Sequence, residues 1–408
     1  MNDLNHSSLD AAAASLGGDD ACFQVIADLE ALRRLKPEWD SLLAQDPDAG
    51  IFLSHDWLAP AFAAHPGRWR VFALRDGAAA LLCILPVKYR VHWSQSQGAF
   101  TTEIEAGGRL AWGEYTGFIC RAGHEETALA AMALHLRALP WKTLSLRYEP
   151  TRRRCDLFAA ALGDGFQHRY RSYRINSGTT DNLVSPQVPL TDDFETLMAE
   201  RLSANTRQKI RRFRRKLLGS GEYRLQVSTP GTVERDIAQL LVNWVAKWSD
   251  KHGEAKAVQI AERYGRALLT AEAMGALYLP TLWQGDRMLG ALGHVIDDRR
   301  KIAHFLVAGR DPAASDPAIG LLLHAEALEW SVGAGLRIYD FGHGDESYKF
   351  SFGPDPERSH YLSVRRAEDT NVLDAICLKP ALQRLAEFAA AGRTESVEKG
   401  ATQLARMV

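Results

Sequence analysis

The chain has 408 residues, of which 46% are hydrophobic and 24% are charged, close to the average for soluble globular proteins. This composition excludes disordered, collagen-like and fibrous classes, and the length corresponds to two or three domains. The 49 basic and 50 acidic residues leave a net charge of -1, so any affinity for nucleic acid or a membrane must be local.

Targeting and redox signals favour a cytoplasmic protein. The 5 cysteines are widely spaced and form no C-x-x-C pair, which argues against a disulfide framework and a zinc site, so we expect no metal. Residues 1–20 carry no Lys or Arg and lack the regions of a signal peptide, so we expect a disordered tail. The most apolar stretch, Ala78 to Val87, is about half as long as a bilayer-spanning helix.

The first half of the chain predicts two helices, then a hairpin, then a helix that leads into a strand. The expected elements are helices at Glu30–Gln45 and Ser54–Ala64, strands at Trp69–Leu74 and Ala80–Val87, a helix at Glu125–Leu139 and a strand at Thr143–Arg147. The hairpin is the clearest of these, because Asp76-Gly77 tolerates the positive φ that a tight turn requires.

The second half repeats that order. We expect a hairpin at Tyr278–Trp283 and Met288–Ile296, a strand at Ile302–Ala308, a helix at Pro317–Val332 and a strand at Leu336–Phe341. Placing Phe72 over Leu279 aligns the two hairpins. This order predicts two copies of one α/β unit, each a mixed, mostly antiparallel sheet flanked by helices, with two unrelated α/β domains as the alternative.

Between the two halves lies one strongly basic segment, residues 201–218. It holds eight cations and no acid, and Ile210, Phe213 and Leu217 form one apolar stripe of a helix that ends at Gly219. It could be a solvated face, an anion site for a nucleotide or lipid-linked diphosphate, a membrane-surface patch or an RNA contact. We expect domains at 21–185 and 186–370, with this helix inserted in the second, and a C-terminal helix and tail at 371–408.

The strand at Ile302–Ala308 is apolar at nearly every position, as expected for a central strand. A Gly-containing loop and a helix follow, with Asp316 as the N-cap and Pro317 at the first helical position. At the start of such a helix the free backbone N–H groups can bind a diphosphate. The signal is weak, because every connection from a strand to a helix has a helix N-terminus.

The loop Asp340–Lys349, with the sequence DFGHGDESYK, is the densest group of titratable side chains. Alternation places Asp340 on one face with Leu336 and Ile338, where it could act as a general base or hold the loop through backbone hydrogen bonds. His294 and His304 lie on adjacent expected strands, and the connecting loop decides whether they share a face. For each we favour a hydrogen-bonded core histidine.

The sequence resembles the CelD-like, or BcsL-like, acyltransferases of bacterial exopolysaccharide and cellulose gene clusters, a branch of the GNAT superfamily close to the FemAB-like peptidyltransferases. The residues that carry the resemblance are Arg207–Lys216, the helix at Trp244–Trp248, Gly290 and, most specifically, Gly335–Lys349. It covers roughly Val25 to Arg366. It implies tandem GNAT-like domains. It also implies a cytoplasmic acyltransferase that acts on a nucleotide- or lipid-linked sugar and could associate with the surface of the inner membrane.

The resemblance also implies roles for particular residues. The pantetheine arm of acetyl-CoA would lie between the strands at Ile302–Ala308 and Leu336–Phe341. We expect catalytic roles for Asp340 or His343 as base, Tyr348 as proton donor to the thiolate and Lys349 as an electrostatic anchor. The expected cofactor-binding residues are Leu306, Val307, Ala308, Gly309, Arg310, Ile319 and Gly320, and the expected substrate-binding residues are Arg207, Arg211, His304 and Asp345.

One departure from the family pattern concerns the donor. The usual diphosphate loop of GNAT enzymes, Arg/Gln-x-x-Gly-x-Gly/Ala, is not cleanly present, and the chain offers Gly309 and then Gly320 inside the helix. A Fem-like enzyme would instead take an amino acid from charged tRNA, and the basic helix would then follow RNA phosphates. A further alternative is a non-catalytic scaffold that docks on a membrane or a synthase complex through that helix.

Overall fold

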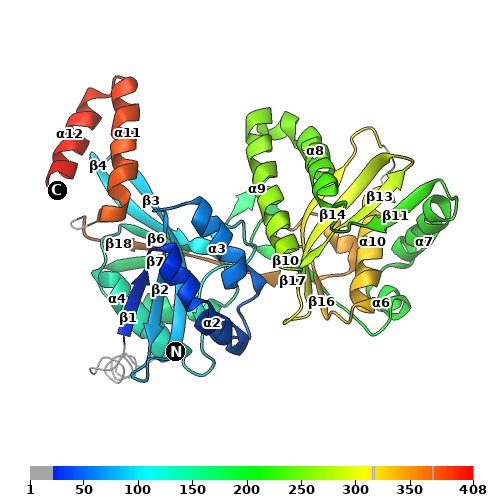
Figure 1. Cartoon of the computed structure of the whole chain (residues 1–408), viewed down its shortest axis with the longest axis horizontal. Coiled ribbons are helices and arrows are strands. Elements are labelled where there is room, and N and C mark those ends of the chain that lie inside the picture. Colours follow the sequence, from blue (N-terminus) through cyan, green and yellow to red (C-terminus); the bar gives the residue numbers. More distant parts are fainter. Residues whose placement is uncertain (1–21, 315, 317, 370–371, 408) are drawn as a thin grey trace. The chain divides into compact units, whose positions relative to one another are not determined.

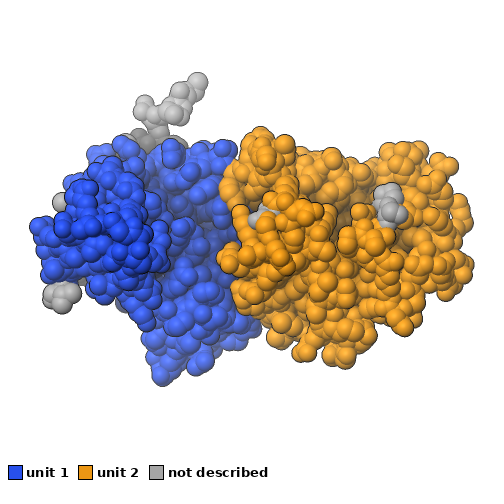
Figure 2. Space-filling model, turned by 90° about the horizontal axis from the view of Figure 1, so that it is seen from above, with its two compact units in different colours: residues 1–172, 359–408 blue, residues 173–358 orange. Residues whose placement is uncertain are grey.

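The computed structural model describes residues 22–314, 316, 318–369 and 372–407, so the expected tail at 1–20 and Pro317 lie outside the described residues. The chain forms two compact units, coloured separately in Figure 2. The first unit takes the residues up to Ser172 together with those from Ser359, and the second takes Tyr173–Arg358.

The first unit contains an eight-stranded mixed sheet in the order β1-β2-β3-β4-β6-β18-β7, with β5 paired to β3 (Figure 1). Its strands are β1 (Cys22–Ile26), β2 (Trp69–Arg75), β3 (Leu81–Ser94), β4 (Ala99–Ala106), β5 (Ile119–Cys120), β6 (Thr143–Glu149), β7 (Phe166–Tyr170) and β18 (His360–Arg366). Its helices are α2 (Leu29–Gln45), α3 (His55–Ala64), α4 (Glu125–Ala138), α5 (Arg152–Leu162), α11 (Leu378–Ala390) and α12 (Thr394–Ala405).

The second unit contains an eight-stranded mixed sheet in the order β11-β13-β14-β15-β16-β10-β17, with β12 paired to β14. Its strands are β10 (Val184–Pro189), β11 (Tyr223–Val227), β12 (Leu277–Tyr278), β13 (Pro280–Gln284), β14 (Arg287–Asp297), β15 (Ile302–Arg310), β16 (Ile338–Asp340) and β17 (Asp355–Arg358). A separate small hairpin pairs β8 (Arg174–Ile175) with β9 (Thr180–Asp181). The helices are α6 (Phe194–Arg201), α7 (Ala204–Phe213), α8 (Val233–His252), α9 (Glu254–Ala273) and α10 (Ala318–Gly333).

The two sheets share one strand order, which confirms the expected duplication of a mixed α/β unit. Each sheet contains one parallel pair, β4 with β6 and β15 with β16, and the other pairings within the two sheets are antiparallel. In each sheet an antiparallel strand lies beyond that pair, namely β18 beside β6 and β10 beside β16.

Those two strands explain why the divisions differ from the expected boundaries at 185/186 and 370. β10 follows the strands of the first half in the sequence but completes the second sheet, and β18 follows the strands of the second half but completes the first. The observed divisions therefore fall at 172/173 and 358/359. Pairing between strands so distant in sequence leaves no local signal in composition or periodicity.

Local capping fixes several of the expected elements. The Ser54 hydroxyl accepts a hydrogen bond from the Trp57 N–H (3.2 Å) and caps α3 as expected. The Asp76 carboxylate accepts from the N–H groups of Ala78 and Ala80 (3.0 and 2.8 Å), which closes the hairpin turn between β2 and β3.

Glycines on the second sheet show which helices cover each of its faces. A Cβ on Gly290 would lie 3.0 Å from Ile319 of α10, whereas one on Gly293 would lie 2.6 Å from Leu268 of α9. A Cβ on Gly309 would lie only 2.1 Å from the Leu240 carbonyl oxygen of α8. Since residues 290 and 293 of one strand point to opposite faces, α10 covers one face and α8 with α9 covers the other (Figure 1).

The parallel pair of the second sheet separates after three residue pairs. Ile302, Ala303 and His304 lie opposite Ile338, Tyr339 and Asp340, and β15 then continues alone on that side to Arg310. A bulge at Leu306 breaks the register with β14, because His294 pairs with Phe305 and Gly293 pairs with Val307. Within the described ranges, no helix has the combined length and apolarity needed to cross a bilayer.

Candidate active site

A buried carboxylate–imidazole pair occupies the last position of the ladder between β15 and β16. His304 Nδ1 lies 2.9 Å from Asp340 Oδ2, and the two side chains are 1% and 0% exposed. The other carboxylate oxygen, Oδ1, accepts hydrogen bonds from the Ser185 hydroxyl (2.7 Å) and the Gly342 N–H (2.8 Å). These partners compensate for the burial of the carboxylate, which would be costly if it had none.

This geometry makes Asp340 an orienting group. Both of its oxygens accept hydrogen bonds, so it holds the following loop through Gly342 and also fixes His304. Because Nδ1 of His304 donates to the carboxylate, the basic lone pair of a neutral ring lies on Nε2. The better candidate for a base is therefore His304, for which the sequence had favoured a substrate-binding or core role.

The two strand histidines lie on opposite faces of the sheet. Val295 pairs with His304 and shares the face of Gly293, so His304 faces α8 and α9, whereas His294 faces α10. His294 is a hydrogen-bonded core residue as expected. Its Nδ1 donates to the Tyr278 carbonyl (3.2 Å), and burial lowers the pKa of His294 to about 3.

The loop after β16 is held by Lys349, which is 3% exposed. Its ammonium group donates to the carbonyl oxygens of Gly342, His343 and Gly344 at 3.2, 3.0 and 2.9 Å and lies 3.0 Å from the Glu346 carboxylate. The positive charge of Lys349 therefore lies inside the loop. There it holds Gly342, whose N–H donates to the Asp340 carboxylate. The ammonium group therefore anchors the loop, and its expected electrostatic role in catalysis stays a prediction.

The other predicted residues of this loop differ in exposure. Asp345 Oδ1 accepts a hydrogen bond from the Asp181 N–H of β9 (2.7 Å), so this carboxylate holds the fold, and its expected substrate contact stays a prediction. His343 is half-buried, and its carbonyl oxygen binds Lys349. Tyr348 is 45% exposed, and its ring centroid lies 5.9 Å from that of His324 on α10.

A second polar cluster, which the sequence did not reveal, lies on the α10 face. The Tyr339 hydroxyl lies 2.8 Å from His294 Nε2 and 2.9 Å from His324 Nδ1. Because His294 donates through Nδ1, its Nε2 accepts from Tyr339, and the tyrosine oxygen in turn accepts from His324 Nδ1. Burial lowers the pKa of His324, so its Nε2 carries a lone pair. One indication of this cluster was present in the sequence, namely the strand alternation that places Tyr339 on the face opposite Asp340.

The predicted donor-binding residues divide into exposed and packed positions. Ala308 and Arg310 are exposed, and Gly320 has open space around it in the first turn of α10. Leu306, Val307, Gly309 and Ile319 are buried within the unit. Gly309 is needed for the close approach of α8, and its contact with the cofactor stays a prediction. The exposed positions fit an acyl-CoA thioester, since an unpaired strand edge leads toward a helix N-terminus.

The basic segment forms two short helical pieces, and most of its cations are engaged within the second unit. α7 ends at Phe213 and continues as a π-helical turn from Arg214 to Leu218. Arg207 donates to the carbonyl oxygens of Met198, Ala199 and Leu202 at the end of α6. The ion pairs include Arg201 with Asp355, Arg211 with Glu195, Arg214 with Glu326 and Glu329, and Lys216 with Asp316. The expected substrate-binding residues Arg207 and Arg211 thus have partners within the second unit, and their contact with substrate stays a prediction.

The corresponding position of the first unit has a different chemistry. Glu105 pairs with Ser145 at the last position of the β4–β6 ladder, and Glu105 binds Lys88 (2.7 Å). Beyond this point the loop at Thr116 lies along β6, because the Thr116 N–H donates to the Tyr148 carbonyl (3.0 Å). In the first unit the chain therefore supplies a backbone partner to β6 beyond the ladder, whereas β16 pairs with β15 only as far as His304.

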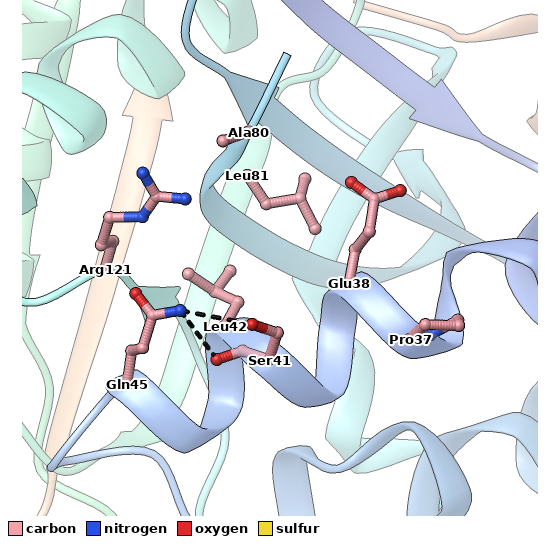
Figure 3. Close-up of a pocket in the computed structure, with 8 residues that line it drawn as sticks. All are labelled: Pro37, Glu38, Ser41, Leu42, Gln45, Ala80, Leu81 and Arg121. Carbon is pink, nitrogen blue, oxygen red and sulfur yellow. Dashed lines mark hydrogen bonds between the residues drawn. The ribbon is translucent and has the colours of Figure 1, made fainter. Parts of the chain in front are cut away.

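A pocket of about 270 Å³ lies in the first unit between α2 and the start of β3 (Figure 3). It is lined by Pro37, Glu38, Ser41, Leu42, Gln45, Ala80, Leu81 and Arg121. Its polar groups contact one another or nearby residues: the Gln45 amide donates to Ser41, and Glu38 binds Arg75. No residue predicted for catalysis or binding lines it.

Comparison with protein families identifies the domain that contains the His304–Asp340 pair. Residues 204–350 match the family described as an acetyltransferase (GNAT) domain. The second unit contains a GNAT acetyltransferase domain. The match runs from α7 through β15, β16 and the Lys349 loop, and it makes the chain an enzyme of the acyltransferase class.

Solved structures of similar fold were also found, and the three described next have low sequence identity to this chain. FemX is 12% identical, covering 80% of this chain and 95% of that chain, with a TM-score of 0.45. L-PGS from Bacillus licheniformis is 12% identical, with coverages of 85% and 95% and a TM-score of 0.48. A tandem GNAT protein from the clavulanic acid biosynthesis pathway is 12% identical, with coverages of 86% and 100% and a TM-score of 0.48. A search of curated proteins found no match.

Proposed function

We propose that the second unit transfers an acetyl group from acetyl-CoA to an amino or hydroxyl group at the point where β15 and β16 separate. The observation that carries this proposal is the buried His304–Asp340 pair at the last position of their ladder, inside the matched acetyltransferase domain. A base held in one orientation next to an open strand edge is what direct acyl transfer requires.

The donor fits the exposed positions of β15 and α10. We place the pantetheine arm along Ala308 and the diphosphate near Arg310 and Gly320. The arm would replace the hydrogen bonds that β15 lacks beyond His304, and Arg310 would compensate phosphate charge.

In the proposed reaction the acceptor nitrogen or oxygen forms a bond to the thioester carbon and the carbon–sulfur bond breaks. His304 Nε2 takes the proton that the acceptor loses, and the Asp340 carboxylate stabilises the imidazolium that forms. Tyr348 gives a proton to the departing thiolate and regains one from solvent. His304 then returns its proton to solvent, so that no net charge accumulates.

For the acceptor we propose a nucleotide- or lipid-linked sugar used in a surface polysaccharide, which includes a role in exopolysaccharide or cellulose synthesis. This step rests on the resemblance of the Gly335–Lys349 segment to CelD-like enzymes. Transient contact with a membrane surface would follow if the sugar is lipid-linked. Lys209, Arg212 and Arg215 are exposed cations that could contribute to such contact.

The test combines binding and turnover. Calorimetry with CoA should show binding to the wild-type protein and to His304→Gln with the same affinity, while transfer of labelled acetyl from acetyl-CoA to an amino-sugar acceptor falls about 10²- to 10⁴-fold in the variant. His168→Gln, at an exposed position of the first unit, is the matched control and should keep full activity.

Three results would contradict the proposal in different ways. Absence of CoA binding would remove the donor, and transfer from charged tRNA would then select the Fem-like alternative. Unchanged turnover in His304→Gln would remove the assigned base. CoA binding without transfer to any sugar tested would leave the donor site and refute the acceptor class.

A further inference from the structure

One face of α8 carries a stripe of side chains that continues past the point where the helix packs on β15. Val233, Ile237 and Leu240 are buried at helical spacing, and Leu240 lies directly over Gly309. The same periodicity continues to Asn243 and Lys247, three and seven residues beyond Leu240. These two polar side chains therefore follow the sheet-facing side of the helix, about 5 and 10 Å further along its axis.

Asn243 presents a buried donor that has no acceptor. The residue is 5% exposed, and its Oδ1 accepts a hydrogen bond from the Gln239 amide (3.2 Å), which fixes the orientation of the side chain. Its Nδ2 is buried and finds no partner within the described part of the chain. A buried donor left without an acceptor costs about 1–3 kcal/mol, so this group is explained if a ligand supplies the oxygen.

Lys247 is an exposed cation on the same stripe, seven residues beyond the contact of Leu240 with Gly309, and its ammonium group lies 5.3 Å from the centroid of the Trp248 ring. Partial burial lowers the pKa of Lys247, the positive charge of Arg310 lowers it further, and the Glu346 carboxylate opposes both. Arg310 ends β15 directly after Gly309, on which Leu240 packs, so the stripe continues to Lys247 from the carboxyl end of β15. No carboxylate of the described residues lies within ion-pair distance of its ammonium group.

We propose that Asn243 and Lys247 form a subsite for a phosphate or diphosphate group of the acceptor. Both groups donate hydrogen bonds, and Lys247 adds a positive charge, so an anionic oxygen ligand suits them. α8 covers the sheet face toward which His304 points, whereas Ala308 and Arg310 are assigned to the donor. The inference rests on the proposed function and specifies what the acceptor must carry.

The test measures binding of UDP by calorimetry with CoA kept at saturation, so that the donor site is filled. UDP should bind this complex, and both Lys247→Met and Asn243→Asp should weaken it about tenfold or more while the affinity for CoA stays within about twofold. Lys256→Met, on the adjacent helix α9, is the control and should bind UDP like the wild-type protein. Should Asn243→Asp fail to fold, Lys247→Met alone decides, because its ammonium group has no ion pair to lose.

A second arm distinguishes a nucleotide from a lipid source of the same group. Flotation with vesicles that contain geranylgeranyl diphosphate should show capture that is lost in Lys247→Met if the acceptor is lipid-linked. The subsite is refuted if CoA binds but neither UDP nor these vesicles bind, if CoA displaces UDP, or if the variants weaken CoA as much as UDP. Failure of CoA itself to bind would instead refute the proposed donor.

Discussion

The free energy of unfolding of the first unit should fall as the pH rises from about 5 to 9, and replacing Glu149 with glutamine should abolish most of this fall. Glu149 ends β6 and is 0% exposed. Its carboxylate accepts hydrogen bonds from the N–H groups of Phe118 (3.1 Å) and Thr151 (3.3 Å). Burial raises the pKa of Glu149 from its ordinary value of 4.5 to about 8, against the opposing charge of Arg154.

The sign and size of the effect follow from that shift. Between pH 4.5 and about 8 the folded protein holds a proton that the unfolded chain has released. The stability of the folded state is therefore full below pH 4.5 and falls as the pH rises toward 8. At about 1.4 kcal/mol for each unit of pKa, the loss is at most roughly 5 kcal/mol.

Urea unfolding followed by tryptophan fluorescence at pH 5 to pH 9 measures this difference. At pH 5 Glu149→Gln should be about 1 kcal/mol less stable than the wild-type protein, because the amide nitrogen cannot accept one of the two backbone hydrogen bonds. At pH 9 the order should reverse, while Glu126→Gln, at an exposed position of α4, should follow the wild-type protein throughout. A difference between Glu149→Gln and wild type that does not change with pH would refute the burial argument.

Three further outcomes are expected. Gly309→Ala should lower the thermal midpoint by an amount that corresponds to about 1–3 kcal/mol, since the new Cβ would meet the Leu240 carbonyl, whereas Gly320→Ala should be neutral or stabilising by up to about 1 kcal/mol. Lys349→Met should cost roughly 2–4 kcal/mol in urea unfolding, because three backbone carbonyl groups lose their donor. Calorimetry should find one CoA per chain, because the Thr116 loop occupies the corresponding place in the first unit.

Local patterns predicted the elements well. The expected hairpin strands at Trp69–Leu74 and Ala80–Val87 are β2 and the first half of β3, and the expected helix at Glu125–Leu139 is α4 to within one residue. The expected strand at Ile302–Ala308 is β15 but ends two residues early. These elements carry their own periodicity, turn residues and caps, so a single stretch of sequence is enough to indicate them.

Pairing between distant segments could not be predicted in the same way. The exchange of β10 and β18 depends on contacts between residues that lie far apart in the sequence, and it moved both expected domain boundaries. The partners of Asp340 were hidden for the same reason, because Ser185 lies on β10. Alternation along β16 placed Asp340 on the same face as Ile338, but it could not show that His304 of β15 is its hydrogen-bond partner.

The placement of adjacent residues on β16 connects these observations. Tyr339 and Asp340 point to opposite faces of the sheet, so the Tyr339 cluster with His324 and Tyr348 lies on the α10 side and the His304 pair lies on the side of α8. In the proposed reaction the proton donor and the base would therefore act from opposite faces. In the proposed reaction the substrates would reach both groups where the paired backbone of β15 and β16 ends, after His304 and Asp340. The thioester carbon of the proposed reaction would then lie level with His304, where the β15–β16 ladder ends.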